Sequence, residues 1–169
     1  MMKRFLLLAL ALAMLMTTAL AESGASYTLD GFELTVPEDV AVEEYDLSMT
    51  VVREHTRVVV QLIPQELTGD GQEQVRGLMP VYNEGISDVT DVETIEGLYG
   101  AMGLINDRFG EGVHEVPVLL LTDGKLLILS GYDLDGDTQA VRALLNELLS
   151  GLTLDGEPVL ATTTVSIVD

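Results

Sequence analysis

Two apolar runs separated by a short polar turn constrain the fold of this chain more than any other feature. Residues 116–121 and 126–130 are almost entirely apolar, and Asp123 and Gly124 lie between them. A half-exposed strand alternates apolar with polar residues, whereas a continuous apolar run is typical of a strand covered on both faces. Asp-Gly between two such runs predicts a β-hairpin. We therefore expect a hairpin at the centre of a sheet, with other layers on both of its faces.

A helix able to cover one of these faces follows within a few residues. Asp137 is placed to cap its N-terminus, and Gly151 stands where helices often end in a left-handed residue. The apolar positions between them recur with helical spacing: Val141, Leu144, Leu145, Leu148 and Leu149. Burying this stripe on the hairpin satisfies both elements, so we expect the stripe to be core and not a partner-binding surface.

Two further hairpins and a second helix are predicted earlier in the chain. Alternating apolar positions flank Asp30 and Gly31 between residues 27 and 36, and the β-rich runs 47–52 and 58–63 flank a polar turn. Residues 72–86 show helical spacing, and Pro80 inside this pattern is expected to kink or divide the helix. Strands are also expected at 89–95 and at 98–105, where glycines indicate bulges or the close approach of another element.

These elements predict an α+β fold: a single antiparallel β-sheet of about six to seven strands, built from hairpins and flanked by helices. No linker divides the chain, so residues 22–154 are expected to form one domain. Residues 155–169 are expected to be a C-terminal tail that either adds an edge strand or stays loose.

Residues 1–21 have the three parts of a secretory signal peptide. Lys3 and Arg4 precede an apolar run at 5–16, and Ala19-Leu20-Ala21 supplies small residues for cleavage before Glu22. The apolar run is shorter than the roughly 20 residues that a membrane-spanning helix needs. We expect a protein that is secreted or held in the cell envelope, with no stable membrane insertion after cleavage. The alternative is an uncleaved N-terminal anchor.

The charge of the chain excludes several classes of function. It has 28 acidic and 8 basic residues, a formal net charge of −20, and no cysteine. No basic stripe is present to neutralise phosphates, so nucleic acid is not expected as a partner. Thiol catalysis, disulfides and zinc–cysteine sites are excluded. A positively charged protein partner or a divalent cation fits the charge, and the alternative is an acidic surface that serves solubility alone.

The densest cluster of carboxylates, Asp133, Asp135 and Asp137, is the candidate metal site. Oxygen ligands at alternate positions suit calcium. In an EF-hand loop beginning at Asp133, however, the sixth residue should be glycine and is Thr138, and the twelfth should be glutamate and is Leu144. The alternative is structural: a turn after a strand, followed by Asp137 as helix cap.

No complete catalytic motif occurs, and we assign no catalytic or cofactor-binding residue. His114 and Glu115 begin a zinc-protease pattern, but Val118 stands where the second histidine is needed and Pro117 opposes the required helix. No nucleophile elbow for serine hydrolysis is present. Paired carboxylates for glycoside hydrolysis stay open among so many acidic residues, although the chain has no tryptophan to stack on sugars.

The order of elements resembles the PsbP-like family of small exported or luminal domains, which includes DcrB-type bacterial envelope proteins. The resembling segments are GFELTVPEDV, VPVLLLTDGKLLILSGYDLDG and DTQAVRALLNELLSGLTL, and the likeness covers most of residues 27–154. The resemblance implies an antiparallel sheet with helices on both faces, an α/β/α sandwich. Members of this fold assist photosystem II, bind a nuclear-import GTPase or have no assigned role, and none of their functional residues matches a position here.

The sequence therefore predicts an exported accessory or binding domain without catalytic activity, presenting an acidic surface to a protein partner in the envelope. Two alternatives stay open: a calcium-binding extracellular domain, and a hydrolase that uses carboxylates.

Overall fold

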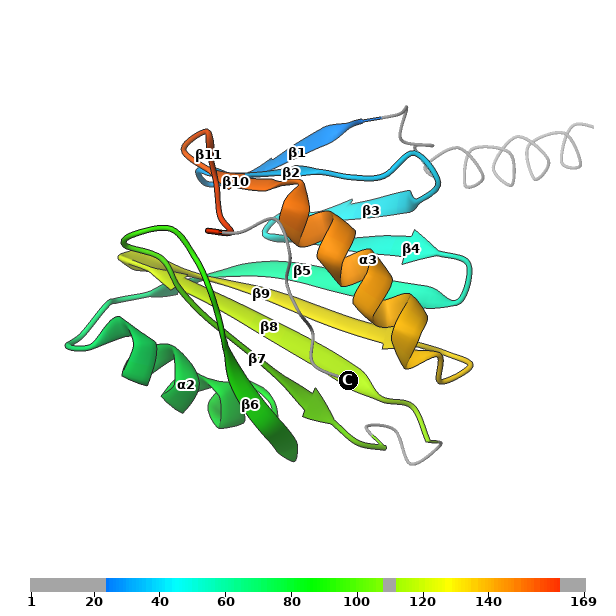
Figure 1. The fold of residues 1–169 in the computed structure, drawn as a ribbon. Helices are drawn as coiled ribbons and strands as arrows, with labels where there is room; N and C mark the ends of the chain where they lie inside the picture. Colours follow the sequence, from blue (N-terminus) through cyan, green and yellow to red (C-terminus); the bar gives the residue numbers. More distant parts are fainter. Residues whose placement is uncertain (1–23, 108–111, 162–169) are drawn as a thin grey trace, which may run out of the picture.

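A seven-stranded antiparallel sheet forms the centre of the computed structural model, which describes residues 24–107 and 112–161 (Figure 1). The predicted signal peptide lies outside these residues. In spatial order the strands are β3 (Ala41–Tyr45), β4 (Ser48–Arg53), β5 (Thr56–Gln65), β9 (Gly124–Asp133), β8 (Glu115–Thr122), β7 (Tyr99–Ile105) and β6 (Ile86–Val92). The α+β class and the antiparallel sheet of seven strands are confirmed.

The hairpin of β8 and β9 occupies the middle of this sheet, as its continuous apolar runs predict. The strands pair in register from Glu115 with Tyr132 to Thr122 with Lys125, on either side of the Asp123-Gly124 turn. Seven consecutive residues of β8 are buried, because layers cover both faces of the strand. The central hairpin thus lies between two hydrophobic cores, one on each face of the sheet.

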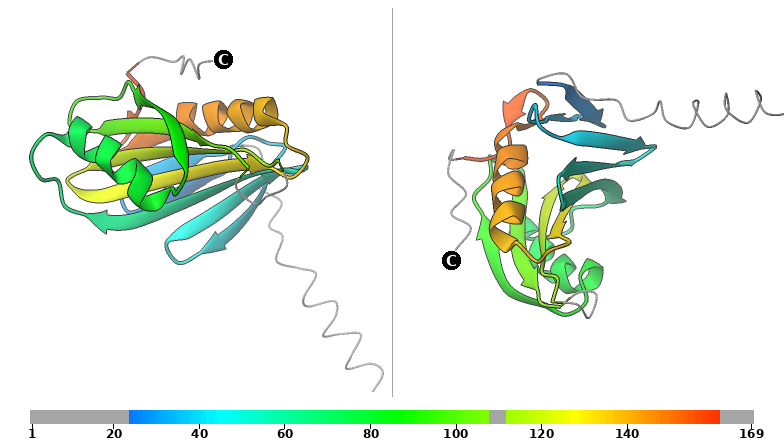
Figure 2. Two further views of the ribbon diagram at one scale, coloured as in Figure 1. Left: turned by 90° about the horizontal axis from the view of Figure 1, so that it is seen from below. Right: turned by 90° about the vertical axis from the view of Figure 1, so that its right-hand side faces the viewer.

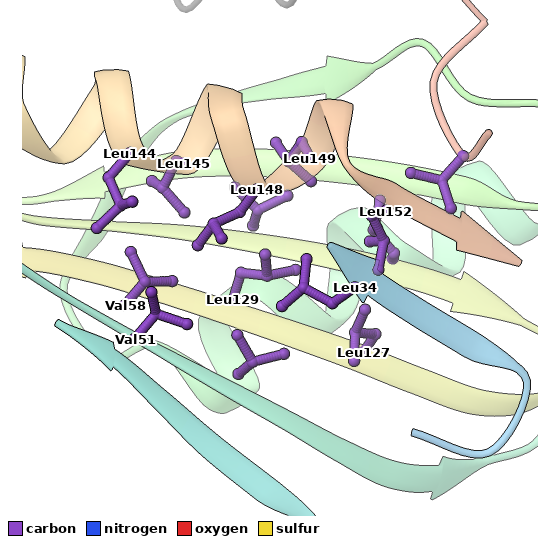
Figure 3. Close-up of a cluster of buried hydrophobic side chains, with 14 of the residues drawn as sticks. Leu34, Val51, Val58, Leu127, Leu129, Leu144, Leu145, Leu148, Leu149 and Leu152 are labelled. Atoms are coloured by element: carbon purple, nitrogen blue, oxygen red, sulfur yellow. The ribbon is translucent and has the colours of Figure 1, made fainter. Parts of the chain in front are cut away.

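In the described part of the chain, one helix packs on each face of the large sheet, and the two views of Figure 2 show the two helices on opposite sides. Helix α3 (Thr138–Ser150) lies on β9, β5 and β8, and α2 (Gly71–Tyr82) lies on β7, β6 and β8. The leucine stripe of α3 is buried against Val51, Val58, Leu127 and Leu129 (Figure 3). The stripe is therefore core. A smaller core lies under α2, around Met79.

A second, four-stranded sheet covers part of the same face as α3 and corrects the expectation of a single sheet. Its order is β1 (Ser26–Leu29), β2 (Phe32–Thr35), β10 (Leu152–Leu154) and β11 (Glu157–Pro158). The predicted hairpin at Asp30-Gly31 forms, with positive φ at both turn residues, but its partner is the chain that follows α3. The side chains of Phe32, Leu34 and Leu152 are buried in the larger core. Such a pairing between the two ends of the chain has no local signal in the sequence.

Gly151 ends α3 for a different reason from the one predicted. Its φ is −91°, outside the left-handed region. Instead, the backbone of β2 passes so close that a Cβ on Gly151 would lie 2.5 Å from the carbonyl oxygen of Thr35. The N–H of Thr35 donates to the Gly151 carbonyl at 2.9 Å. Because Gly151 has no side chain, the backbone of β2 can lie directly against the C-terminal end of α3.

Pro80 neither divides α2 nor lies at its middle. The helix runs without interruption from Gly71 to Tyr82, and Pro80 falls in its last turn. A proline there removes one hydrogen bond near the C-terminus, where the helix is ending anyway. The glycines of β7 behave as predicted: a Cβ on Gly100 would lie 2.8 Å from Val92, and one on Gly103 would lie 2.6 Å from Ile86.

The predicted tail contributes to the fold over its first residues. β11 closes the small sheet, and Val159 and Leu160 are buried in the larger core. Leu160 also forms an isolated bridge with Thr94, beside β6. Residues 162–169 lie outside the part that the structure describes.

Candidate functional site

The three aspartates of the candidate calcium cluster lie at one end of the large sheet, where β9 leads into α3. Asp133 is the last residue of β9 and is buried. Its carboxylate accepts a hydrogen bond from the Thr56 hydroxyl at 2.7 Å and from the backbone N–H groups of Asp135 and Asp137 at 2.8 and 3.2 Å. Burial raises the pKa of Asp133, but these hydrogen bonds outweigh it, so the net shift is downward. The ionised side chain organises the turn.

Asp137 and Asp135 have different partners from Asp133. The Asp137 carboxylate accepts from the N–H groups of Gln139 and Ala140 at 3.0 and 3.1 Å and caps α3, as predicted. Asp135 is exposed and hydrogen-bonds Nδ1 of His55, in the turn between β4 and β5. This hydrogen bond, together with the charge of Asp135, raises the pKa of His55.

Within the described ranges, no three His, Asp or Glu side chains come together in an arrangement able to hold a metal ion. The calcium hypothesis stays a prediction. A calcium ion here would compete with the hydrogen bonds that Asp133 and Asp137 already accept.

The two histidines lie just before two different strands at this end of the sheet. His55 precedes β5 and His114 precedes β8, and β9 separates those two strands. Glu115, next to His114, is buried in β8 and accepts a hydrogen bond from the Ser130 hydroxyl of β9. The zinc-protease pattern is thus part of a strand, not of the helix that such a motif requires.

A large part of the sheet on the side of α2 is not covered by that helix. Helix α2 packs on β6, β7 and β8, at one end of the strand order (Figure 2). The side chains that project to its side from β3, β4, β5 and the end of β9 are half-buried or exposed. We call these side chains the open face. They are Glu43, Tyr45, Thr50, Val52, Arg57, Val59, Gln61, Ser130 and Tyr132. Their alternate neighbours, such as Val51 and Val58, are buried in the core under α3.

Strand register sets the neighbours within the open face. Arg57 of β5 is paired with Val52 of β4 on one side and with Tyr132 of β9 on the other. In an antiparallel sheet, side chains at paired positions have Cβ atoms about 4.5–5.5 Å apart. Arg57 therefore lies in the middle of a row, between an aliphatic side chain and a phenol.

The outer edge of the open face is acidic and carries exposed apolar side chains. Tyr45 is 63% exposed and Leu47, in the turn between β3 and β4, is 58% exposed. Glu43, Glu44 and Asp46 alternate with them and are also exposed. The Tyr45 hydroxyl donates to Glu43 at 3.4 Å. We call residues 43–47 the acidic edge; they end β3 and begin the turn, at one margin of the seven-stranded sheet.

The sequence predicted neither the acidic edge nor the open face. Strand β3 has only one buried residue, Val42, so its sequence shows little alternation of apolar and polar residues. The apolar residues at alternate positions, Val40 and Val42, were the signal from which this strand could have been predicted. The open face depends on where α2 rests along the sheet, which no local pattern encodes.

No family model and no curated protein sequence matches this chain. Solved structures that are similar to it include the following two. The solution structure of cyanobacterial PsbP from Synechocystis sp. PCC 6803 has a TM-score of 0.54 and 12% identity, over 77% of this chain and 90% of that one. A crystal structure from Bacteroides thetaiotaomicron has a TM-score of 0.45 and 11% identity over 78% of this chain, which spans about half (48%) of that protein. The fold is PsbP-like, and at these identities the likeness concerns the fold alone.

Proposed function

We propose that this chain is an exported accessory or binding domain without catalytic activity, which binds a protein partner in the cell envelope or medium. We assign the contact to the acidic edge and the adjoining open face. The observation that supports this most is the exposure of Tyr45 and Leu47 among three carboxylates. Exposed tyrosines are enriched where proteins bind one another, and an apolar contact inside a charged rim is typical of such interfaces.

The chemistry of the acidic edge favours a partner that is basic and extended. Among the strands that the structure describes, β3 is paired with β4 alone, so its outer side can receive a further strand. The carboxylates of Glu43 and Glu44 disfavour pairing between two copies of this acidic chain, because like charges would face each other. A segment carrying lysine or arginine would meet the opposite charge.

Export is supported by the sequence of residues 1–21 and by the resemblance to DcrB-type envelope proteins; we propose that this chain is related to them. In the described part of the chain, neither α2 nor α3 combines the length and the apolar character of a membrane-spanning helix. The calcium-binding and hydrolase alternatives remain predictions.

Photo-crosslinking in intact cells tests the assigned surface. A benzoyl-phenylalanine placed at position 45 of the full chain is expected to capture one discrete protein. Replacing Glu43 and Glu44 by lysine should reduce that adduct at least roughly tenfold, since reversal of rim charges mainly slows association. The matched control replaces Glu93 and Glu96, exposed between β6 and β7, and should leave the adduct unchanged. Equal loss in both variants, or no adduct at all, would show that this surface is not the contact.

A further inference from the structure

Among the residues that the structure describes, Arg57 differs from the basic side chains that form ion pairs with carboxylates. Arg53 forms ion pairs with Asp39 and Glu147, Arg76 pairs with Asp91, and Lys125 pairs with Asp30. Arg57 forms no ion pair with any residue that the structure describes, and its Nη1 is buried without a hydrogen-bond partner. In a chain with 28 acidic residues, an unpaired guanidinium is not explained by a shortage of carboxylates.

The position of Arg57 makes it a candidate contact for a ligand. It lies within the open face, half-buried, and its side chain projects to the side that α2 leaves uncovered. Its paired neighbours are Val52 and Tyr132, and Val59 is the next side chain on the same face of β5. The guanidinium of Arg57 thus lies among apolar side chains that are themselves half-buried.

The chemistry of guanidinium selects the ligand. Arginine stays charged under all physiological conditions, and its planar donors match the two oxygens of a carboxylate. A buried N–H without an acceptor is unfavourable, and reorientation of the half-buried guanidinium toward a carboxylate on the open face would remove that cost. We propose that the open face binds a carboxylate of the protein partner through Arg57, while Val52, Val59 and the ring of Tyr132 contact the apolar part of the same residue.

The charges around Arg57 favour a single carboxylate over a phosphate or a lipid surface. Glu115 stands in the same cross-strand row, beyond Tyr132, and Glu43 lies at the edge of the same face. These charges and the net charge of −20 repel a doubly charged phosphate and an anionic membrane more strongly than they repel one carboxylate. The inference rests on the proposed function and adds to it: the partner would combine basic residues for the acidic edge with one carboxylate for Arg57.

Titration of the ¹⁵N-labelled protein with N-acetyl-L-phenylalanine tests the proposal directly. This probe carries one carboxylate and one apolar group, and N-acetyl-L-phenylalaninamide has the same shape without the charge. We expect saturable NMR shifts at the Arg57 Nε–H and at the amides of β5 and β9. The amide probe should bind at least about tenfold more weakly, as expected for the loss of a charge-assisted hydrogen bond.

Variants separate Arg57 from general charge effects. Arg57→Gln should weaken binding of the acid to the level of the amide, whereas Arg57→Lys, which keeps the charge but not the paired donors, should bind with intermediate strength. Arg76→Gln removes the same charge from exposed α2 and should bind like the parent. Heteronuclear spectra of each variant verify the fold.

Each of the following results would overturn the proposal. Equal binding of the acid and the amide would show that Arg57 contributes no charge recognition. Shifts that map away from β5 and β9, or that persist in Arg57→Gln, would place any site elsewhere. Saturable binding of inorganic phosphate at Arg57, tighter than that of the acid, would identify the ligand as a phosphate. If the crosslink at position 45 forms while N-acetyl-L-phenylalanine does not bind, this inference fails and the proposed function stands.

Discussion

Three aspartates within five residues perform three different tasks in this fold. Asp133 is buried and holds the turn after β9, Asp135 is exposed beside His55, and Asp137 caps α3. The sequence shows them only as an acidic cluster with the spacing of calcium ligands. The cap was predictable because the helix begins at the next residue. The role of Asp133 was not, because Thr56, one of its partners, lies 77 positions earlier in the chain.

Replacement of the cap tests the structural interpretation of this cluster. Asp137→Ala is expected to lower the free energy of unfolding by about 1 kcal/mol, because the N–H groups of Gln139 and Ala140 lose their acceptor. Asp135→Asn should change little, since both Asp135 and His55 are exposed. Urea denaturation measures both. A rise in melting temperature on adding calcium, abolished by Asp135→Asn, would instead favour the metal site.

At the scale of secondary structure, the elements predicted best are those whose burial is set by their neighbours in sequence. The β8–β9 hairpin and α3 are consecutive, and each buries the apolar surface of the other. Strand β3 was missed because it is short and mostly exposed. The small sheet was missed as a separate layer because β2 meets β10 after more than a hundred intervening residues. Local sequence patterns predict single helices and strands, but they do not predict which strands pair when those strands are far apart in the chain.

The leucine stripe of α3 gives a test of this packing. Leu145 is fully buried between the helix and the sheet, so Leu145→Ala is expected to cost about 2–5 kcal/mol. That loss is a large share of the free energy of unfolding of a typical domain, which is roughly 5–15 kcal/mol. Leu134→Ala is the matched control, because Leu134 is 52% exposed in the turn before α3. Urea denaturation should show a large loss for Leu145→Ala and almost none for Leu134→Ala.

The opposite outcome is equally specific. If Leu145→Ala unfolds at the urea concentration of the parent but loses a bound partner, the stripe is an interface. The layered arrangement of α3 on the large sheet would then be wrong.

On the scale of the whole molecule, the excess of negative charge opposes the packing of two apolar cores. Self-repulsion among carboxylates destabilises a compact state, and it weakens as they are protonated. Carboxylates that accept hydrogen bonds in the folded state have the opposite effect, because protonating them weakens those bonds and destabilises the fold. The pKa of Asp133 is lowered, and Arg76 lowers the pKa of Asp91 through their hydrogen-bonded ion pair. Both groups therefore bind protons less readily in the folded state than in the unfolded chain.

These opposing effects predict the pH dependence of stability. A carboxylate with a lowered folded pKa contributes stability above its unfolded value of about 3.9, and this is lost as pH falls through the folded pKa. His55 has a raised pKa, so its contribution is present below its unfolded value of about 6.5 and is lost as pH rises through the folded one. Melting temperature measured from pH 3 to 8 should therefore peak at mildly acidic pH and fall steeply below about pH 4. Asp133→Asn should lower the melting temperature at neutral pH and flatten the acid side. His55→Gln should flatten only the side above the peak, and by less, because His55 and Asp135 are both exposed. A melting temperature that keeps rising down to pH 3 would show that general repulsion, not the hydrogen bonds of Asp133 and Asp91, governs the acid stability of this protein.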